Sequence, residues 1–503
     1  MGNLLSIKVQ KYKKFYKSSR VFHIYFLILQ SKTDKPSMNQ TERANFGTKI
    51  GIILATAGSA VGLGNVWRFP YMTGQNGGAA FLIIYVACVL MLGIPCMLNE
   101  FIIGRRAQAN TARAYSKLAN GTPWRLIGIF GVFTGFLITG YYVVVSGWCL
   151  QYIYASVAGH LNGDASYVKT YFETFSSHPW KPVVWMLVFM LLCHFIISRG
   201  VEKGIERASK LMMPLLFVLL VVIAVASCLL PGAGKGITFL FSPDFSSVDS
   251  KILLGALGQA FYSLSLGMGC LCTYASYFKR DTHLTKSAVQ IVSIDTLIAI
   301  LAGLMIFPTF FASYPDAADK LADPQLASQY SGPGLVFITL PNVFQQAFSS
   351  VPLVGEIVAL LFYALLSLAA LTSLMSLHEV STAFFHEELK ITRAKGAVIV
   401  TLLCSVIGVF CALSYGDTRD WLVFGGESVF NWFDFLTGQI FLPTGGLLTC
   451  LFMGWYVPKH LIKDEFTNGG TLRGRFFGFY FFMVRYVCPI CILLIFLHQF
   501  NVI

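Results

Sequence analysis

The sequence predicts an all-α polytopic membrane protein with eleven transmembrane helices, built as a 5+5 inverted repeat in which helices 1 and 6 are broken. The chain of 503 residues is 55% hydrophobic and only 12% charged, whereas soluble domains carry about 25% charged residues. Eleven apolar segments are long enough to cross about 30 Å of hydrocarbon. Two of them, five spans apart, are interrupted at corresponding positions, which indicates an inverted repeat with a site near the membrane midplane.

The expected spans cover residues 49–72, 79–103, 124–157, 181–198, 207–230, 252–278, 287–312, 352–386, 394–414, 427–456 and 474–498. We assign 43–230 to the first repeat (spans 1–5) and 231–457 to the second (spans 6–10), with an extracellular loop at 313–351. Residues 458–503 hold the eleventh span and the C-terminus. We expect 1–42 to be a basic tail, disordered or interfacial, with Met38 as an alternative initiator.

The basic residues behind the net charge of +13 lie mainly in the connecting loops, which does not indicate a nucleic-acid-binding surface. Alternate loops carry most of the Lys and Arg; the loop 104–125, for example, has five basic residues and no acidic one. This asymmetry is typical of cytoplasmic loops. It predicts a multi-pass protein of the cell (inner) membrane with a cytoplasmic N-terminus, in contact with the lipid bilayer and with no nucleic-acid partner.

The first span contains Gly58-Ser-Ala-Val-Gly-Leu-Gly-Asn-Val-Trp-Arg-Phe-Pro70. Glycine weakens a helix and proline breaks it, and opened backbone is tolerated in a membrane only against protein or water. We therefore expect a break at residues 60–65 that turns carbonyl oxygens and an Asn side chain toward a small cation. The simpler alternative is close helix packing of small residues.

The sixth span repeats the pattern with Gly255-Ala-Leu-Gly-Gln-Ala-Phe-Tyr-Ser-Leu-Ser-Leu-Gly-Met-Gly269. We expect a third interruption at Pro443-Thr-Gly-Gly446 in span ten, and a helix at residues 335–348 in the long loop. The twelve cysteines are scattered, mostly within apolar spans, and predict buried thiols rather than a disulfide framework.

Taken together, these motifs resemble the neurotransmitter:sodium symporter family, especially its prokaryotic amino-acid transporters of the leucine-transporter fold. The resemblance rests on Gly62-Leu-Gly-Asn-Val-Trp-Arg-Phe-Pro70, Asn76-Gly-Gly78, Gly93-Ile-Pro95 with Glu100, Gly255-Ala-Leu-Gly-Gln259, Ser263-Leu-Ser-Leu-Gly267, Thr273-Tyr-Ala-Ser-Tyr277, Leu371-Thr-Ser373 and Asp434. It implies a transporter rather than an enzyme, namely a symporter that imports a hydrophobic or aromatic α-amino acid with sodium by alternating access.

The resemblance implies two sodium sites, which suits a hard cation that takes oxygen ligands. The first would use Ala60, Asn65, Ser263 and Asp295, completed by the substrate carboxylate. The second would use carbonyls of Gly58, Val61 and Ala369 with hydroxyls of Thr372 and Ser373. For these two hydroxyls the simpler alternative is hydrogen bonding back to their own helix. The fixed charge of Asp295 predicts that no chloride is required.

The resemblance also places the substrate between the two breaks. The implied pocket consists of Ala60, Leu63, Gly64, Ile138, Tyr142, Tyr262, Ser265, Met268, Leu374 and Leu377. Two gates are implied: Arg68 with Asp434 on the outside, and Arg43 with Glu387, helped by Tyr277, on the inside. The alternatives to sodium symport are a proton-coupled amino-acid permease of the same architecture and a membrane channel.

Overall fold

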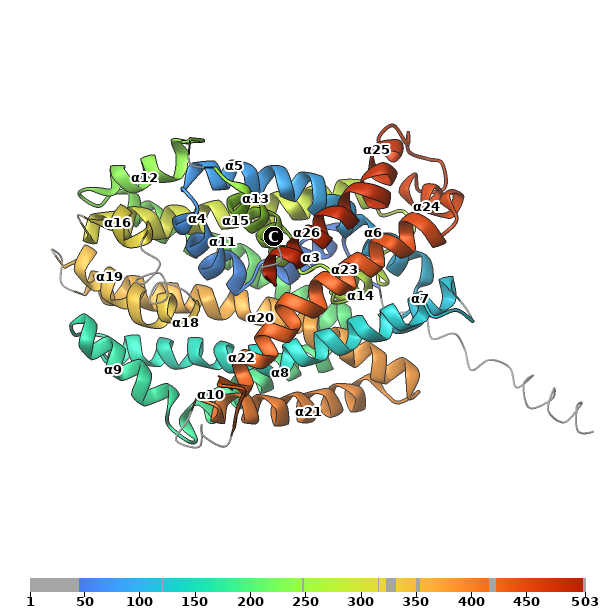
Figure 1. Ribbon diagram of the computed structural model, residues 1–503. Coiled ribbons are helices and arrows are strands. Elements are labelled where there is room, and N and C mark those ends of the chain that lie inside the picture. Colours follow the sequence, from blue (N-terminus) through green and yellow to red (C-terminus); the bar gives the residue numbers. More distant parts are fainter. Residues whose placement is uncertain are drawn as a thin grey trace, which may run out of the picture. The chain divides into compact units, whose positions relative to one another are not determined.

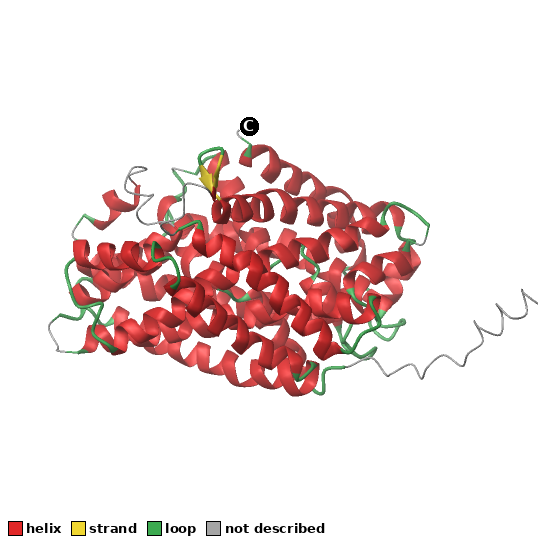
Figure 2. Ribbon diagram, turned by 90° about the horizontal axis from the view of Figure 1, so that it is seen from below, coloured by secondary structure: helices red, strands yellow, loops and turns green. Residues whose placement is uncertain are grey.

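The computed structural model describes residues 45–119, 121–246, 248–314, 316–322, 332–349, 353–415 and 422–500. These residues are almost entirely helical (Figure 2). The strands that they contain are β1 (Val423–Phe424) and β2 (Glu427–Ser428), which pair antiparallel. The predicted N-terminal tail lies outside the described residues, as does Arg43 of the predicted inner gate.

Within the described residues, nine helical segments are long and apolar enough to cross a membrane. They are Ala79–Ala107, Arg125–Val157, Lys181–Ser198, Val201–Cys228, Leu284–Ser313, Val354–Glu388, Arg393–Leu413, Val429–Tyr456 and Phe477–Gln499. A tenth span is the pair Lys49–Ala60 and Gly64–Gln75, bent by 55°. The sixth span in chain order consists of two short helices, α13 (Ser250–Ser263) and α14 (Cys270–Ala275), so the structure agrees with the predicted eleven.

Several spans change between α-helical and π-helical segments along their length. The α-helices are α3 (Lys49–Ala60), α4 (Phe69–Gln75), α5 (Ala79–Cys88), α6 (Ile94–Ala107), α8 (Arg125–Val157), α10 (Lys181–Ser198), α11 (Arg207–Cys228), α15 (Leu284–Ser313), α20 (Val354–Glu388), α21 (Arg393–Leu413), α22 (Val429–Asp434), α23 (Leu442–Leu451), α25 (Phe477–Phe482) and α26 (Cys488–Gln499). The π-helical segments are Gly64–Arg68, Val89–Gly93, Val201–Glu206, Leu335–Thr339, Phe435–Phe441, Phe452–Tyr456 and Met483–Val487.

Shorter helices lie between the spans: α7 (Thr111–Leu118), α9 (Ala165–Ser176), α12 (Ala233–Phe241), α16 (Ala317–Ala322), α18 (Gly332–Gly334), α19 (Leu340–Ala347) and α24 (Lys459–Phe466). Two of them, α18 and α19, enclose the π-helical segment Leu335–Thr339, which confirms the helix predicted in the long loop.

Polar N-caps set where several of these helices begin. The side chains of Thr48, Asn110, Asp164 and Asp249 each accept a hydrogen bond from a backbone N–H in the first turn of α3, α7, α9 and α13. Such caps satisfy N–H groups that have no partner inside the helix. The helix starts are therefore encoded locally, and packing decides how the helices assemble.

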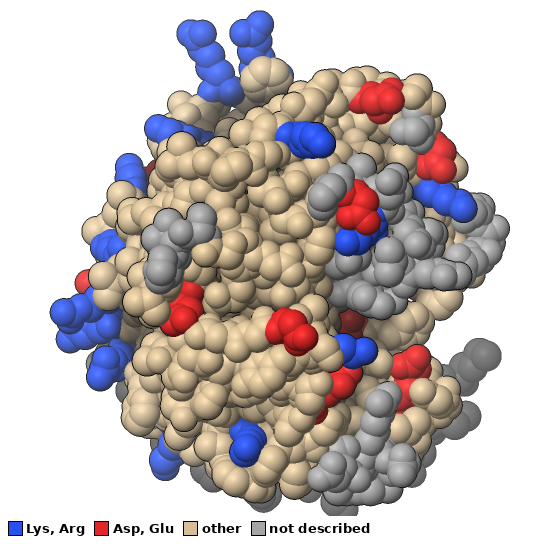
Figure 3. Space-filling model, turned by 90° about the vertical axis from the view of Figure 1, so that its left-hand side faces the viewer, with Lys and Arg blue, Asp and Glu red and all other residues tan. Residues whose placement is uncertain are grey.

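The long helices of residues 45–503 run across Figure 1, and the connecting segments gather at its two ends. One end carries α9, α16 and α19, and the other carries α7, α24 and α25. Figure 3 views the first end, where both acidic and basic side chains lie between wide uncharged areas. Helices α8 and α20 pack along each other through the bundle, while α10, α11, α21 and α26 expose large apolar side chains, as lipid-facing helices do.

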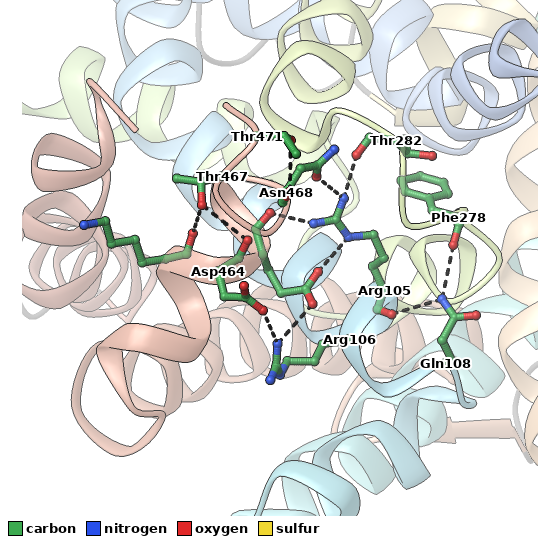
Figure 4. A network of polar contacts seen from close by, with 11 residues as sticks. Arg105, Arg106, Gln108, Phe278, Thr282, Asp464, Thr467, Asn468 and Thr471 are labelled. Atoms are coloured by element: carbon green, nitrogen blue, oxygen red, sulfur yellow. Dashed lines mark hydrogen bonds and ion pairs between the residues drawn. The ribbon is translucent and has the colours of Figure 1, made fainter. Parts of the chain in front are cut away.

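At the second end, two arginines fasten α24 to the end of α6 (Figure 4). Arg105 has a side chain only 2% exposed and donates to Glu465 Oε2 at 2.7 Å, to Asn468 Oδ1 at 2.6 Å and to the Thr282 carbonyl at 2.6 Å. Arg106 pairs with Asp464 at 3.0 Å. This network joins the end of span two to the segments that follow spans six and ten.

The predicted interruption of span ten is wrong. Pro443 lies in the first turn of α23, directly after the π-helical segment Phe435–Phe441, and the helical segment Val429–Tyr456 is continuous. A wider π-helical turn accommodates the missing N–H of proline without ending the helix. The glycines instead allow close packing: a Cβ on Gly445 would lie 2.3 Å from the Gly267 carbonyl oxygen.

Candidate transport site

Span one is broken where the sequence predicts it. Helix α3 ends at Ala60, Val61 adopts extended dihedral angles (φ −70°, ψ 109°), and helical structure resumes at Gly64. The Gly62 N–H donates to Asn65 Oδ1 at 3.1 Å, so the break carries its own cap. A Cβ on Gly62 would lie 2.6 Å from Ser373 Oγ. The backbone thus approaches span eight more closely than a side chain would allow.

The break in span six is longer, and residues of neighbouring helices stabilise it. Between α13 and α14, Ser265 (φ 53°), Gly267 (φ 85°) and Gly269 (φ 76°) adopt the left-handed region. The buried carboxylate of Glu100 on α6 accepts the Gly267 N–H at 2.8 Å and the Cys272 N–H at 3.2 Å. These two N–H groups would otherwise be buried without a partner, at a cost of about 1–3 kcal/mol each.

Three of the four residues predicted for the first sodium site form one buried cluster. Asn65 Nδ2 donates to Asp295 Oδ1 at 2.8 Å and to Ser263 Oγ at 3.2 Å, and Ser263 Oγ donates to Asp295 Oδ2 at 2.9 Å. Asn65 and Asp295 are fully buried. The cluster joins both breaks to span seven, and Ala60 lines the cavity beside it.

The residues predicted for the second sodium site lie between span one and span eight. Ser373 Oγ donates to the Val61 carbonyl at 3.0 Å and to the Gly58 carbonyl at 3.5 Å, across the two helices. Thr372 Oγ1 instead donates to the Ala369 carbonyl at 2.9 Å within its own helix. The back-bonding alternative therefore describes Thr372 but not Ser373.

A cavity lies where the two breaks face each other. It is lined by Ala60, Leu63, Gly64, Ile138, Tyr142, Tyr262, Ser265, Met268 and Leu377, which are nine of the ten residues predicted for the substrate pocket. Leu374 is buried elsewhere and does not line it. The Tyr142 hydroxyl accepts the Leu63 N–H at 3.3 Å. No lining residue is Asp, Glu, Lys or Arg.

The predicted outer gate has both of its residues close to the cavity but no direct ion pair. The Arg68 guanidinium stacks on the Tyr262 ring at 4.2 Å, and Asp434 accepts a hydrogen bond from the Tyr141 hydroxyl at 3.1 Å. Among the described residues, no contact within 4.0 Å joins Arg68 to Asp434. Arg68 thus contacts the cavity lining through the ring of Tyr262.

Two residues of the predicted inner gate, Glu387 and Tyr277, are described by the structure, and each belongs to a different hydrogen-bond network. Glu387 accepts from the Asn110 N–H at 2.9 Å and from Asn110 Nδ2 at 3.0 Å. The Tyr277 hydroxyl donates to Glu379 Oε1 at 2.6 Å, and Arg393 donates to the same oxygen at 2.7 Å. Sequence reasoning missed Glu379 and Arg393. A signal was present, since Glu379 is an acidic residue within an apolar span and such residues mark functional or paired positions.

The sequence of this chain matches the profile of the Sodium:neurotransmitter symporter family over residues 43–174 and 167–503. It is 37% identical to the "Uncharacterized sodium-dependent transporter YhdH" of Bacillus subtilis over 464 residues, which cover 92% of this chain and 98% of that protein. The chain belongs to the Sodium:neurotransmitter symporter family.

Two further proteins are similar to this chain. The "Sodium- and chloride-dependent GABA transporter 2" of Rattus norvegicus is 26% identical, over 78% of this chain and 69% of that protein. The crystal structure of MhsT in complex with L-phenylalanine superimposes with a TM-score of 0.79 and 41% identity, covering 90% of this chain and 99% of MhsT. The predicted fold is confirmed, and the chain is a multi-pass, sodium-dependent transporter rather than an enzyme.

Proposed function

We propose that this symporter imports an α-amino acid with a hydrophobic or aromatic side chain, together with sodium, across the cytoplasmic membrane. The observation that carries this proposal is the cavity between the two breaks, whose lining is apolar apart from hydroxyls and backbone groups. A charged side chain would be buried there without a counter-charge, which is costly. Relatives that are described as sodium-dependent support the coupling ion, and the L-phenylalanine bound to MhsT supports the substrate class.

The backbone of the breaks supplies groups for a zwitterion. We assign the substrate carboxylate to the N–H groups of Leu63 and Gly64 and to the Tyr142 hydroxyl. This hydroxyl accepts from Leu63, so its own proton remains for a second partner. We assign the ammonium group to carbonyl oxygens of Ala60, Tyr262 and Ser265. The side chain then faces Ile138, Met268 and Leu377, all three of which line the cavity.

We propose two sodium sites at the clusters described above. At the first, hydrogen bonds of 2.8–3.2 Å join Asp295, Ser263 and Asn65. Asn65 Oδ1, which accepts the Gly62 N–H, would have to coordinate the ion as well. The second uses the carbonyl oxygens of Gly58, Val61 and Ala369 with the hydroxyls of Thr372 and Ser373. The ion at the first site would touch the substrate carboxylate, which couples the two.

We propose that transport requires no chloride, because Asp295 supplies a fixed negative charge beside the first sodium site. Asn65 and Ser263 both donate hydrogen bonds to its carboxylate. The variant Asp295→Asn keeps the size of the side chain and removes the charge. We expect it to lose uptake in chloride-free medium, and either to regain it with chloride or to remain inactive. Unchanged uptake by this variant without chloride would contradict the proposal.

Reconstituted liposomes test the function directly. Labelled tryptophan, tyrosine and leucine are offered to the protein under an inward sodium gradient, with chloride present or replaced by gluconate. We expect saturable uptake that stops when choline replaces sodium. Uptake driven by a proton gradient without sodium would favour the proton-coupled permease, and non-saturating flux would favour a channel. Preference for glutamate or lysine over tryptophan would contradict the assigned substrate class.

A further inference from the structure

Three cysteines from three different spans meet inside the bundle. Cys96 lies on α6, Cys450 on α23 and Cys488 on α26, and all three are buried. The Sγ atoms of Cys96 and Cys450 are 3.6 Å apart, and Cys488 interacts with both. Asn99 Nδ2 donates to Cys450 Sγ at 3.6 Å. Of the twelve thiols, these three form a cluster that does not line the transport cavity.

The cluster lies beside the break in span six. Cys96 precedes Glu100 by one helical turn, and Glu100 holds the backbone of the break through Gly267 and Cys272. Cys450 follows Gly446 by one turn, and a Cβ on Gly267 would lie 2.8 Å from the Gly446 nitrogen. Helices α6 and α23 therefore hold the break from two sides, and the two thiols bridge these helices.

Burial in the membrane interior restricts what reaches the thiols. Half-buried Cys491 lies one turn after Cys488 on α26, a helix of the eleventh span that exposes Ile490 and Leu493. An apolar oxidant dissolved in lipid can approach from this side. Among the described residues, no group of three or more His, Cys, Asp or Glu is arranged to hold a metal ion.

We propose that Cys96 and Cys450 form a redox-sensitive clasp, that is, a pair of thiols that a lipid hydroperoxide oxidises to a disulfide. The disulfide links α6 to α23 across the break in span six, and this link arrests transport. One thiol attacks the peroxide and becomes a sulfenic acid, releasing an alcohol. The second sulfur then displaces water and the S–S bond forms. The two thiols lose two electrons and two protons, and the O–O bond accepts the electrons. The sulfurs must approach by about 1.5 Å, since an S–S bond measures about 2.05 Å.

The clasp acts on conformational change rather than on the binding residues. Alternating access requires the two sides of the site to move relative to each other. A covalent bond between the two helices that hold the break fixes their separation. Reduction by a thiol or a phosphine breaks the bond and restores both thiols. The arrest is therefore reversible, which distinguishes it from oxidative damage.

The experiment uses the full chain in liposomes treated with cumene hydroperoxide. Mass spectrometry of non-reduced peptides is expected to find Cys96 linked to Cys450, and sodium-driven uptake is expected to fall by most of its initial value and to return after reduction. Cys96→Ala and Cys450→Ala are expected to retain uptake after treatment. The control Cys193→Ala, which removes a buried thiol from α10, is expected to respond like the unmodified protein.

Several outcomes would overturn the clasp: no link between the two residues, a link from Cys450 to Cys488 in its place, or a link that leaves uptake unchanged. The peptide mapping and its reversal use the unmodified protein, so they show whether the link forms even where a cysteine variant misfolds. They also need no substrate. A failure of untreated protein to transport any amino acid would therefore count against the proposed function, and an absent link would count against the clasp.

Discussion

The two breaks expose backbone in the same membrane interior, but they are supported differently. The break in span one covers residues 61–63, and its Gly62 N–H is capped by Asn65, three residues further along the same segment. The break in span six covers residues 264–269, contains three left-handed residues, and depends on Glu100 of α6 and on the glycines of α23. The first break has a cap within its own segment in addition to contacts with Tyr142 and Ser373, whereas the second takes its support from α6 and α23. Substitutions near the second should therefore cost more stability.

The largest effect is expected for Gly267→Ala. The new Cβ would lie 2.4 Å from the Leu442 carbonyl oxygen, at a backbone φ of 85°. A left-handed alanine costs about 1–2 kcal/mol, and overpacking adds about 1–3 kcal/mol. We expect the melting temperature in detergent to fall and uptake to be lost.

Gly258→Ala is the matched control, because it lies in the same span but its Cβ would make an ordinary contact of 3.8 Å with Ile495. This variant is expected to melt at or slightly above the temperature of the unmodified protein. Equal melting temperatures for both variants would show that the break in span six does not depend on α23.

Glu100→Gln tests the support from α6. One oxygen of the glutamine still accepts a backbone N–H, but its NH₂ group faces the other, so one buried donor loses its partner. We expect a loss of about 1–3 kcal/mol in unfolding free energy, measured by thermal unfolding.

The control is Thr73→Val, which removes a buried hydroxyl that has no hydrogen-bond partner among the described residues. It is expected to be neutral or stabilising. A Glu100→Gln protein as stable as this control would remove the distinction drawn between the two breaks.

Asn65→Ala tests the local cap and its link to the proposed first sodium site. It removes the acceptor for Gly62 and two hydrogen bonds to Asp295 and Ser263. Hydrogen bonds to charged groups contribute about 1.5–3 kcal/mol, so the half-saturating sodium concentration should rise by about tenfold or more. It is measured by sodium activation of uptake.

The companion variant Thr56→Val lies on α3 and removes a buried hydroxyl without a partner among the described residues. Its sodium activation should match that of the unmodified protein. Overlapping curves for both variants would argue against Asn65 as a sodium-site residue.

The smallest effect on stability is expected at Ser265, where a favourable hydrogen bond and an unfavourable backbone conformation oppose each other. Its hydroxyl donates to the Ser59 carbonyl at 3.2 Å, which joins the break in span six to the last turn of α3, while its φ of 53° is strained for a serine. Ser265→Gly loses the bond but removes the strain, each worth about 1 kcal/mol. Ser265→Ala loses the bond and keeps the strain. Thermal unfolding should rank alanine below glycine, and the reverse order would mean that the strain is not significant.

Much of the fold follows from local sequence features. The apolar segments, the polar caps and the glycines of both breaks are properties of neighbouring residues, and the predicted spans and the predicted breaks in spans one and six agree with the structure. Span ten shows the limit of this approach. Pro443 and the two glycines after it predict an interruption of the helix. In the structure, a π-helical segment accommodates the proline, and the glycines contact Gly267.

In the candidate site, too, some features could be predicted from the sequence and others only from the structure. Nine of the ten residues predicted for the pocket line one cavity, whereas Leu374 lies outside it, because one turn of α20 presents only part of its surface to the cavity. The pair of Glu379 and Arg393 and the contact of Cys96 with Cys450 join residues from different helices. No short pattern connects such residues, so only the packed bundle brings them together.

The sequence by itself determined that this chain spans a membrane, where it spans, and that spans one and six open at their centres, because hydrophobicity, capping and helix breaking act over a few residues. Only the tertiary structure decided what occupies each opening. Asn65 meets Asp295 across 230 positions and Glu100 meets Gly267 across 167. Buried polar groups need partners wherever the fold supplies them, and distance along the chain carries no information about which side chain that will be.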